Sequence, residues 1–478
     1  MIYQRAIQHR TFRRREIALL LGAALFLFAA NAVGGTIIVA ILAVVIILGV
    51  IAFRMPVWTA VFFVAFTPVN RFVIQATFHL AGLEGFSSIA GLWRDALLGI
   101  LCARVIYDAF FSTTPKRLRY LDILVLFFVG LSAAYLVYPG TQETDALTRI
   151  QGFRTDSSFM LAYFVGRSLR LSRPNTRWLV LAIVPGSVLV AVVAVWQFAA
   201  PASANGVFDA LGLREARERD IAGVGLIRAS SLLLGDLALS FYQIVLVALA
   251  SALLFHAKNT LRRWLAGGFL VAMIGTLILT VTRSSIIAAV PVVVIAAQST
   301  RAYGRLAVLT AVCLAVGLAF VVASGLEPEH LQRLTDPGEA SAQARLIAAA
   351  KSFDIVQDNP LGQGLGTAGT IGQRYLGAAA ITNESWYLQL ATEMGPLVAV
   401  LYVAIVLMTM VLAFLAYRNI EDVWLRVLAL TVATAAIGFL IVGNFLHAWE
   451  NTVLSMVYWL YAGVAVRARE LEASWTRR

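Results

Sequence analysis

The amino-acid sequence is a series of apolar runs, many about twenty residues long, separated by short polar links. About twenty apolar residues in a helix span the roughly 30 Å hydrocarbon core of a membrane. The chain is 60% hydrophobic and 13% charged, with a mean hydropathy of +0.82, and soluble domains rarely have such a composition. We therefore predict an all-α polytopic membrane protein.

About fourteen runs read as helices, and the shortest are ambiguous, so the prediction is about 12–14 transmembrane helices. The expected order is helices 1–11 within residues 1–324, one long helical loop at 325–385, and helices 12–14 within 386–478. The expected runs are residues 17–33, 35–53, 57–70, 88–106, 121–138, 158–169, 177–199, 229–254, 265–281, 284–297, 305–323, 386–416, 424–443 and 450–466.

The distribution of basic residues predicts the orientation. Four arginines between residues 10 and 15 precede the first run, which has no small-residue cleavage site, so we expect an uncleaved first helix. With the N-terminus in the cytoplasm, every alternate link is basic, as the positive-inside rule requires. Both termini are then cytoplasmic, and the net charge of +12 needs no nucleic-acid partner. The basic links lie at about 116–119, 167–177, 258–263, 301–305, 418–426 and 467–478.

The outer links lie at about 139–157, 200–228 and 325–385, with shorter external turns at about 71–87 and 444–449. Their cations are almost all arginine, whose planar fork of donors suits phosphate oxygens. We therefore predict an anionic, phosphate-bearing ligand on the outer side. The outward cations are Arg71, Arg94, Arg149, Arg154, Arg214, Arg217, Arg219, Arg228, Arg283, Arg333, Arg345, Lys351 and Arg374.

Arg228 and Arg283 stand out among these cations. Each is followed by serines where an apolar run begins, so each is expected at a helix start that would offer free N–H donors to an anion. Asp236 is expected about two turns into the helix after Arg228, as an intramembrane carboxylate. The alternative is that both arginines extend to lipid headgroups.

The long loop contains three distinct pieces. Residues 341–358 have helical periodicity, carry Arg345 in the first turn and end at Asn359-Pro360. Gly364 to Gly369 then fits G-x-G-x-x-G, but no strand precedes it, so a dinucleotide site is rejected. These glycines indicate either close backbone approach to a ligand or a flexible turn.

The chain re-enters the membrane at residues 382–390, and Gly395-Pro396 breaks the helix shortly after. Asn383 and Glu384 are expected at the outer mouth, with Glu393 about two turns deeper. Carboxylates near arginines are candidates for general-base catalysis. The alternative is that Asn383 caps the helix and Glu384 interacts with its dipole.

Four blocks together resemble the bacterial O-antigen ligase and polymerase superfamily. They are the stretch from Arg345 to Gly366, the re-entry residues Asn383, Tyr387-Leu388 and Glu393-Met394-Gly395, the block Thr280–Ser285, and the region of Arg228. The resemblance covers roughly residues 225–400.

The resemblance implies a glycosyltransferase of the bacterial inner membrane, with the long loop in the periplasm. Such an enzyme passes a glycan from undecaprenyl pyrophosphate to a glycan or lipid-linked acceptor during surface polysaccharide or exopolysaccharide synthesis. It needs no cofactor or metal, and other polysaccharide assembly proteins are possible partners. The implied catalytic residues are Glu384, Arg283 and Arg228, and the implied substrate-binding residues are Arg345, Asn383, Gly364, Gly366, Tyr387 and Glu393.

One position departs from the family pattern. Ligases of the family carry histidine just before the asparagine of the re-entry motif, where this chain has Thr382. The sequence therefore resembles the polymerases more than the ligases. Glu384 is the expected base, with His447 or Glu450 in reserve.

A transporter or flippase of a lipid-linked or anionic solute is the alternative function. It would explain the many helices, the broken ones, and the charged residues Arg94, Asp95 and Asp236 within apolar runs. Matched motifs in a long external segment favour the glycosyltransferase.

Overall fold

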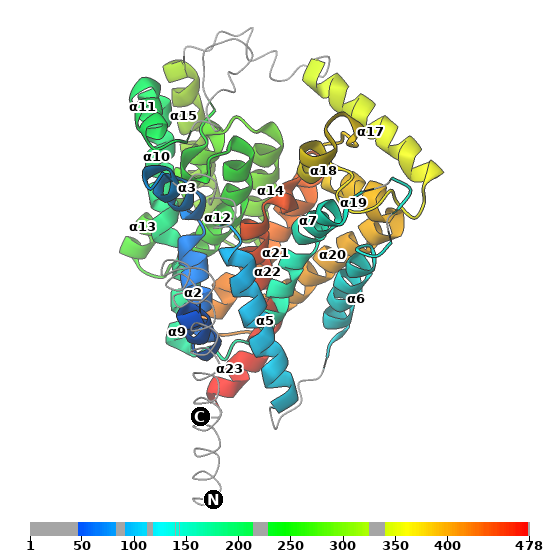
Figure 1. Ribbon diagram of the computed structural model, residues 1–478. Helices are drawn as coiled ribbons and strands as arrows, with labels where there is room; N and C mark the ends of the chain where they lie inside the picture. Colours follow the sequence, from blue (N-terminus) through cyan, green and yellow to red (C-terminus); the bar gives the residue numbers. More distant parts are fainter. Residues whose placement is uncertain are drawn as a thin grey trace, which may run out of the picture.

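A computed structural model describes residues 46–476, apart from 83–90, 112–117, 139, 143, 214–227 and 325–339. This part of the chain is helical, and its only β pairing is an isolated bridge between Ala368 and Ile381 (Figure 1). The all-α prediction is confirmed. The helices are α2 (Pro56–Phe66), α3 (Asn70–Leu80), α5 (Trp93–Phe111), α6 (Tyr120–Ala134), α7 (Ala146–Asp156), α8 (Leu161–Ser168), α9 (Arg173–Leu181), α10 (Ile183–Ala199), α11 (Pro201–Ala210), α12 (Asp236–His256), α13 (Thr260–Leu279), α14 (Arg283–Ser299), α15 (Tyr303–Ser324), α17 (Ala340–Asp358), α18 (Gly369–Leu376), α19 (Trp386–Met394), α20 (Pro396–Arg418), α21 (Val423–Val442), α22 (Thr452–Val466) and α23 (Ala468–Thr476).

Five segments within the described residues are long and apolar enough to cross a membrane: α9 with α10, α12, α13, α20 and α21. A sixth is counted if Ile46–Arg54 and α2, which are bent by 114° at the break between them, form one span. Shorter apolar helices are α6, α14, Tyr303–Ala315 of α15, and α22. The chain is a polytopic membrane protein, as predicted; the expected run at 17–33 lies outside the described residues.

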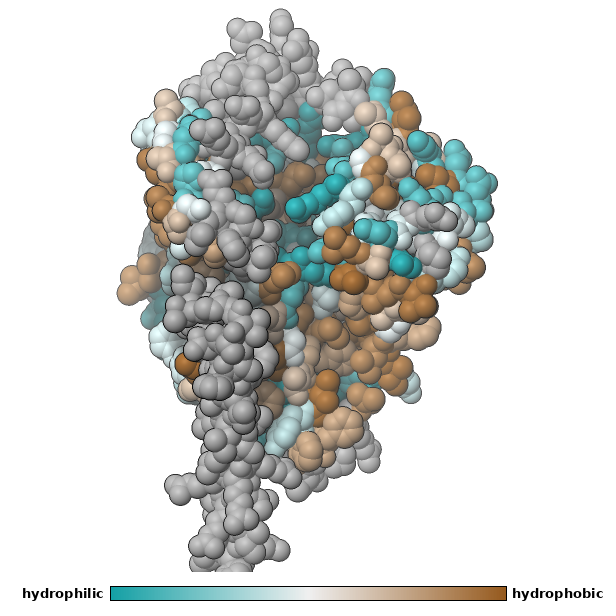
Figure 2. Space-filling view, in the orientation of Figure 1, coloured by the Kyte–Doolittle hydropathy of each residue, from teal (hydrophilic) through white to brown (hydrophobic). Residues whose placement is uncertain are grey.

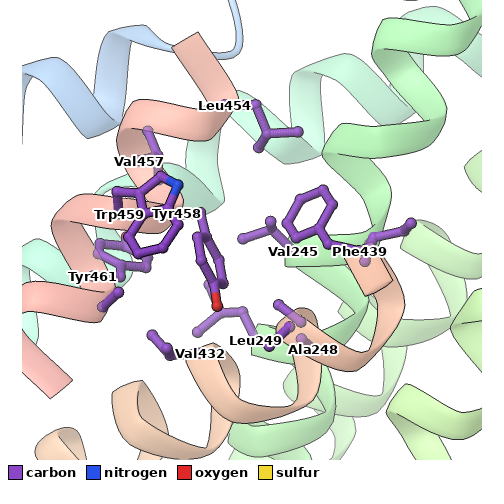
Figure 3. Close-up of a cluster of buried hydrophobic side chains, with 14 of the residues drawn as sticks. Val245, Ala248, Leu249, Val432, Phe439, Leu454, Val457, Tyr458, Trp459 and Tyr461 are labelled. Atoms are coloured by element: carbon purple, nitrogen blue, oxygen red, sulfur yellow. The ribbon is translucent and has the colours of Figure 1, made fainter. Parts of the chain in front are cut away.

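The core of the molecule forms around α12 and α21. Both helices are buried over most of their length, as expected of helices that are apolar on every side. Helix α22 packs beside them, and its Tyr458 lies among apolar side chains of α12 and α21, including Leu249 and Phe439 (Figure 3).

Helices α8 and α22 approach each other through two glycines. A Cβ atom at Gly463 would lie 2.0 Å from the carbonyl oxygen of Tyr163, and one at Gly166 would lie 2.0 Å from that of Leu460. Small residues allow such close backbone contact between membrane helices. The contact holds α7, which leads into α8, near the turn that precedes α22.

The predicted basic links meet at one end of the bundle. The Arg467 guanidinium donates to the carbonyl of Arg167 at 2.9 Å, and Arg119 donates to that of Val466 at 3.2 Å. Helix α23 lies at this end, at the bottom of Figure 1, whereas α17 and α18 lie near the top. The basic end is therefore opposite the end that carries the long loop.

The helix predicted at 229–254 begins later than expected. Residues Ser231–Leu233 form a 3-10 turn, α12 starts only at Asp236, and Asp236 is thus its first residue. The cause is a tertiary contact: the Gln197 side-chain oxygen accepts from the backbone N–H groups of Ser230 and Ser231, at 3.2 and 2.7 Å. The prediction of a helix start at Arg228, with Asp236 two turns inside, was wrong.

The external turn predicted at 71–87 was also wrong in part, because Asn70–Leu80 form α3. Helix α3 mixes polar and apolar residues, so no continuous apolar run marks it in the sequence. The break predicted at Gly395 is confirmed: it has a φ of 88° and separates α19 from α20.

Candidate active site

A cavity of about 1350 Å³ opens at the end of the bundle that carries α17 and α18. Figure 2 shows hydrophilic residues gathered around a hollow in the upper half of this face, above a mostly hydrophobic lower half. Two glutamates and two histidines are among the lining residues: Glu384, Glu450, His79 and His447. Six arginines also line it: Arg71, Arg94, Arg154, Arg228, Arg345 and Arg374.

All six arginines belong to the set predicted to face outward. They come from α3, α5, α7, the segment before α12, α17 and α18, so helices far apart in sequence contribute to one cavity. Of the other predicted outward cations, Arg214, Arg217, Arg219 and Arg333 lie outside the described residues, whereas Arg149, Arg283 and Lys351 do not line the cavity.

Arg345 and Glu384 form an ion pair across the cavity mouth. The Arg345 Nε atom lies 2.5 Å from Glu384 Oε2, and both side chains are about half exposed. Arg345 extends from α17, which packs on α19, and Glu384 stands two residues before α19 begins. The structure thus brings together two predicted site residues.

Asn383 lies beside this pair, at the cavity wall. Its side chain is buried, with 3% exposure, and its amide has no hydrogen-bond partner among the described residues. The cap of α19 is Ser385, whose Oγ accepts from the N–H of Leu388, so the helix-cap interpretation of Asn383 is wrong. A buried unpaired amide is costly, and one that lines a cavity is suited to bind a polar ligand.

His447 approaches the same segment from the turn between α21 and α22. Its Nε2 lies 2.7 Å from the carbonyl oxygen of Asn383. A carbonyl only accepts, so Nε2 carries the hydrogen of this bond. The other ring nitrogen, Nδ1, is buried and has no partner among the described residues. A second acid, Glu450, accepts from the N–H of Thr370 at 3.1 Å.

Arg228 also lines the cavity and pairs with Asp236 at 3.3 Å. The chain around it is held by a hydrogen bond from the N–H of Ala229 to the carbonyl of Leu279, 3.1 Å long. Leucine and phenylalanine side chains continue this wall: Leu232, Leu233, Leu237 and Phe241. The charged guanidinium of Arg228 therefore lies next to an apolar surface of the cavity.

Arg283 is the first residue of α14, so the helix start predicted there is confirmed. Its side chain is exposed and is not among the residues that line the cavity. The structure therefore does not bring Arg283 together with Arg228 and Glu384 in this cavity.

Gly364, Gly366, Tyr387 and Glu393 also do not line the cavity. The glycine segment lies against the protein's own backbone: Gly364 N donates to the carbonyl of Glu393 at 2.9 Å, and a Cβ at Gly366 would lie 2.7 Å from the carbonyl oxygen of Thr148. The Tyr387 hydroxyl donates to the carbonyl of Leu440 at 3.3 Å. The glycines therefore allow the backbone of this segment to approach α19 and α7 closely.

Glu393 forms a buried carboxyl pair with Asp156 of α7. Glu393 Oε1 accepts from the N–H of Ala368 at 2.8 Å, and Asp156 Oδ1 accepts from Gln389 Nε2 at 3.1 Å. Burial raises the pKa of Glu393 to about 7 and raises that of Asp156 well above its usual value, and the charge of Glu450 adds to both shifts. The raised pKa values favour a protonated carboxyl in this pair, which joins α7, α19 and the glycine segment.

Sequence reasoning did not assign several residues of the cavity. Arg71, Arg94, Arg154 and Arg374 were noted as outward cations without a place in the site, because nothing in their spacing shows which helices meet. Asp156 carries no motif of its own. The reserve bases His447 and Glu450 do lie at the cavity.

The fold and the cavity define a polytopic helical membrane protein with an arginine-rich site. Comparison with known families adds that residues 268–403 match the family Wzy_C, described as O-antigen ligase. This stretch of the chain is a domain of that family, as the sequence motifs predicted, and the family implies a glycan-transferring enzyme that uses lipid-linked glycans. No curated protein matches the chain.

Proposed function

We propose that the protein is a glycosyltransferase of the bacterial inner membrane that polymerises glycan repeats carried on undecaprenyl pyrophosphate. The observation that supports this most is the cavity, where arginines, an unpaired amide and candidate bases meet. The family match covers one wall, with Arg345, Arg374, Asn383 and Glu384.

In this reaction the protein mainly positions the two substrates and stabilises the charge that develops on the leaving group. An acceptor hydroxyl attacks the anomeric carbon of the donor sugar, the bond from that carbon to the pyrophosphate oxygen breaks, and polyprenyl pyrophosphate leaves. Negative charge develops on the leaving oxygen, and arginines aimed at it stabilise the transition state. Arg228 suits this role, because apolar residues next to it can accommodate the first part of a polyprenyl chain.

Glu384 is the proposed general base, which takes the proton of the attacking hydroxyl. Its ion pair with Arg345 places the carboxylate at the mouth, beside the unpaired amide of Asn383. In this proposal Asn383 orients the acceptor, and His447 orients Asn383 through the carbonyl oxygen. Thr382, where ligases of the family carry histidine, favours polymerisation over ligation.

The proposed orientation places the cavity in the periplasm and both termini in the cytoplasm. The clustering of basic links at the end opposite the cavity supports it, because basic links favour the cytoplasmic side. The residues Gly364, Gly366, Tyr387 and Glu393 then support the site by holding α19 in place.

The test replaces Arg228 with Gln in cells and measures their lipid-linked saccharides. The expected result is an accumulation of single repeats and a loss of long chains, at unchanged protein level. Arg283→Gln is the matched comparison, since this exposed arginine lies outside the cavity lining, and it should retain most chain extension. Normal chain length in the Arg228 variant would contradict the proposal.

A second set of variants identifies the base. Glu384→Gln should abolish chain extension, and His447→Gln should reduce it only in part. If His447→Gln abolished extension while Glu384→Gln left it intact, Glu384 would not be the base. Accumulation of full-length lipid-linked chains in a deletion strain would instead identify a ligase.

A further inference from the structure

We propose that Arg71, Arg94 and Arg154 form a second anion subsite in the cavity, which binds the pyrophosphate of a lipid-linked acceptor. This inference rests on the proposed function and specifies its second substrate. The donor pyrophosphate would lie at Arg228 and the acceptor pyrophosphate at the three arginines.

The three arginines come from three helices that pack around one part of the cavity. Arg71 is the second residue of α3, Arg94 the second of α5, and Arg154 lies near the end of α7. Arg154 pairs with Asp95 at 2.8 Å, and Arg94 Nε donates to the carbonyl of Gly91 at 3.1 Å. All three line the cavity, so their donors can reach a ligand.

The cluster holds like charges close together. The charged groups that act on Arg94 are Asp95, which attracts it, and Arg71 and Arg154, which both repel it. Like charges at short range in a partly buried site are unfavourable, and a bound anion would relieve the repulsion. A phosphate group offers oxygens to several guanidinium forks at once.

This cluster is separate from the arginines assigned to the donor. Arg228 and Arg345 pair with other carboxylates, Asp236 and Glu384, and neither is among the charges that act on Arg94. The cluster also lies outside residues 268–403, the stretch that matches the family.

The residues beside the cluster suit a carbohydrate. Gln75 of α3 and Gln151 of α7 line the cavity next to Arg71 and Arg154, and their amides can both donate to and accept from sugar hydroxyls. An acceptor anchored here by its pyrophosphate could extend its glycan toward Glu384. Such an acceptor is itself a lipid-linked repeat, so the subsite predicts polymerisation.

The experiment counts undecaprenyl pyrophosphate molecules bound to the full-length protein in lipid nanodiscs, by native mass spectrometry. The wild-type protein should bind two, and Arg228→Gln should bind one. The double variant Arg71→Gln/Arg94→Gln should also bind one, and Arg71→Lys/Arg94→Lys should recover part of the second. The control is Arg104→Gln, on α5 but outside the cavity lining, where Arg104 pairs with Asp108 at 3.0 Å; it should bind two.

The outcomes separate this inference from the proposed function. One bound lipid in the wild type, lost in Arg228→Gln, would overturn the second subsite and leave the glycosyltransferase intact. Two lipids on the Arg71→Gln/Arg94→Gln variant would also overturn it. No bound lipid in the wild type would contradict the proposed function itself.

A competition arm tests the source of the phosphate. With labelled undecaprenyl pyrophosphate bound, the unlabelled lipid should displace the second labelled molecule. A phosphorylated glycolipid that lacks the polyprenyl chain should not displace it. Stronger displacement by the phosphorylated glycolipid would overturn the choice of a lipid-linked acceptor. The number of lipids bound to the wild-type protein tests the second subsite even if the double variant fails to fold.

Discussion

The Asn383 amide and the Asp156–Glu393 pair are both buried polar groups, but their environments differ. The Asn383 amide lines the cavity and has no hydrogen-bond partner among the described residues, whereas one oxygen of each carboxyl of the pair accepts from a donor of the protein. Buried polar groups without partners cost stability, so they are usually kept where a ligand completes them. Replacement of Asn383 is therefore expected to affect activity, and replacement of the Asp156–Glu393 pair is expected to affect stability.

Replacing Asn383 with Ala should lower the transfer rate by about 10²-fold, the usual effect of removing one aligned donor. Its effect on the free energy of unfolding should be below about 1 kcal/mol, because the amide has no hydrogen bond to lose. The measurement is transfer rate together with thermal stability. Ser385→Ala is the contrast: loss of the α19 cap should cost about 1 kcal/mol of stability and less activity. A stable, fully active Asn383→Ala protein would remove Asn383 from the site.

The Asp156–Glu393 pair should make stability depend on pH. Because the folded-state pKa of each carboxyl is raised, the folded protein holds more protons than the unfolded chain. Stability is therefore greatest at low pH and falls as pH rises from about 4.5 through about 7, by on the order of 3 kcal/mol for Glu393.

The double variant Asp156→Asn/Glu393→Gln keeps the acceptors for Gln389 and Ala368 but cannot titrate. Its stability should exceed that of the wild type at pH 8 and lose most of the decline between pH 5 and pH 8, measured by thermal unfolding in detergent. The matched control is Glu421→Gln, at an exposed carboxylate, which should follow the wild-type curve. The same decline in the double variant would mean that the pair does not hold the proton.

The glycine segment after α17 depends on backbone geometry that only glycine tolerates well. Gly362 has a φ of 78°, and a Cβ there would lie 2.4 Å from the carbonyl oxygen of Glu393. Gly377 also has a positive φ, of 55°, but a Cβ there would meet nothing within 4 Å. Alanine at position 377 would therefore introduce backbone strain alone, whereas alanine at position 362 would introduce both strain and a steric conflict.

Gly377→Ala should cost about 1–3 kcal/mol, from the strain of its positive-φ backbone conformation alone. Gly362→Ala should cost more, because the segment must also move away from α19, and it should reduce transfer by displacing Asn383 and Glu384. Thermal unfolding and transfer assays of the two variants test this. Equal losses in both would show that contact with α19 does not position the site.

The helices that the sequence predicts well are those with continuous apolar runs, such as α12, α20 and α21, because membrane burial determines them locally. The errors occurred where tertiary contacts decide. Gln197 holds residues 230 and 231 out of a helix, and α3 is amphipathic rather than apolar. The site was predicted in part: the motif placed Arg345, Asn383 and Glu384, but no local pattern shows that Arg71, Arg94 and Arg154 converge with them.

At the scale of the whole molecule, basic residues concentrate at two opposite ends. Basic links and α23 gather at one end, and the arginine-lined cavity opens at the other. Between them lies the packed core of α12, α21 and α22 (Figure 3). The first turns of α12 and α22 line the cavity, so the cavity wall is continuous with this core.

The most direct test uses the purified protein in proteoliposomes with a labelled undecaprenyl-pyrophosphate-linked repeat. We predict that the saccharide is lengthened, with release of one undecaprenyl pyrophosphate for each bond formed, and that Arg228→Gln and Glu384→Gln abolish both. Movement of the labelled lipid across the bilayer, with no lengthening under any condition, would contradict the proposed glycosyltransferase and identify a flippase.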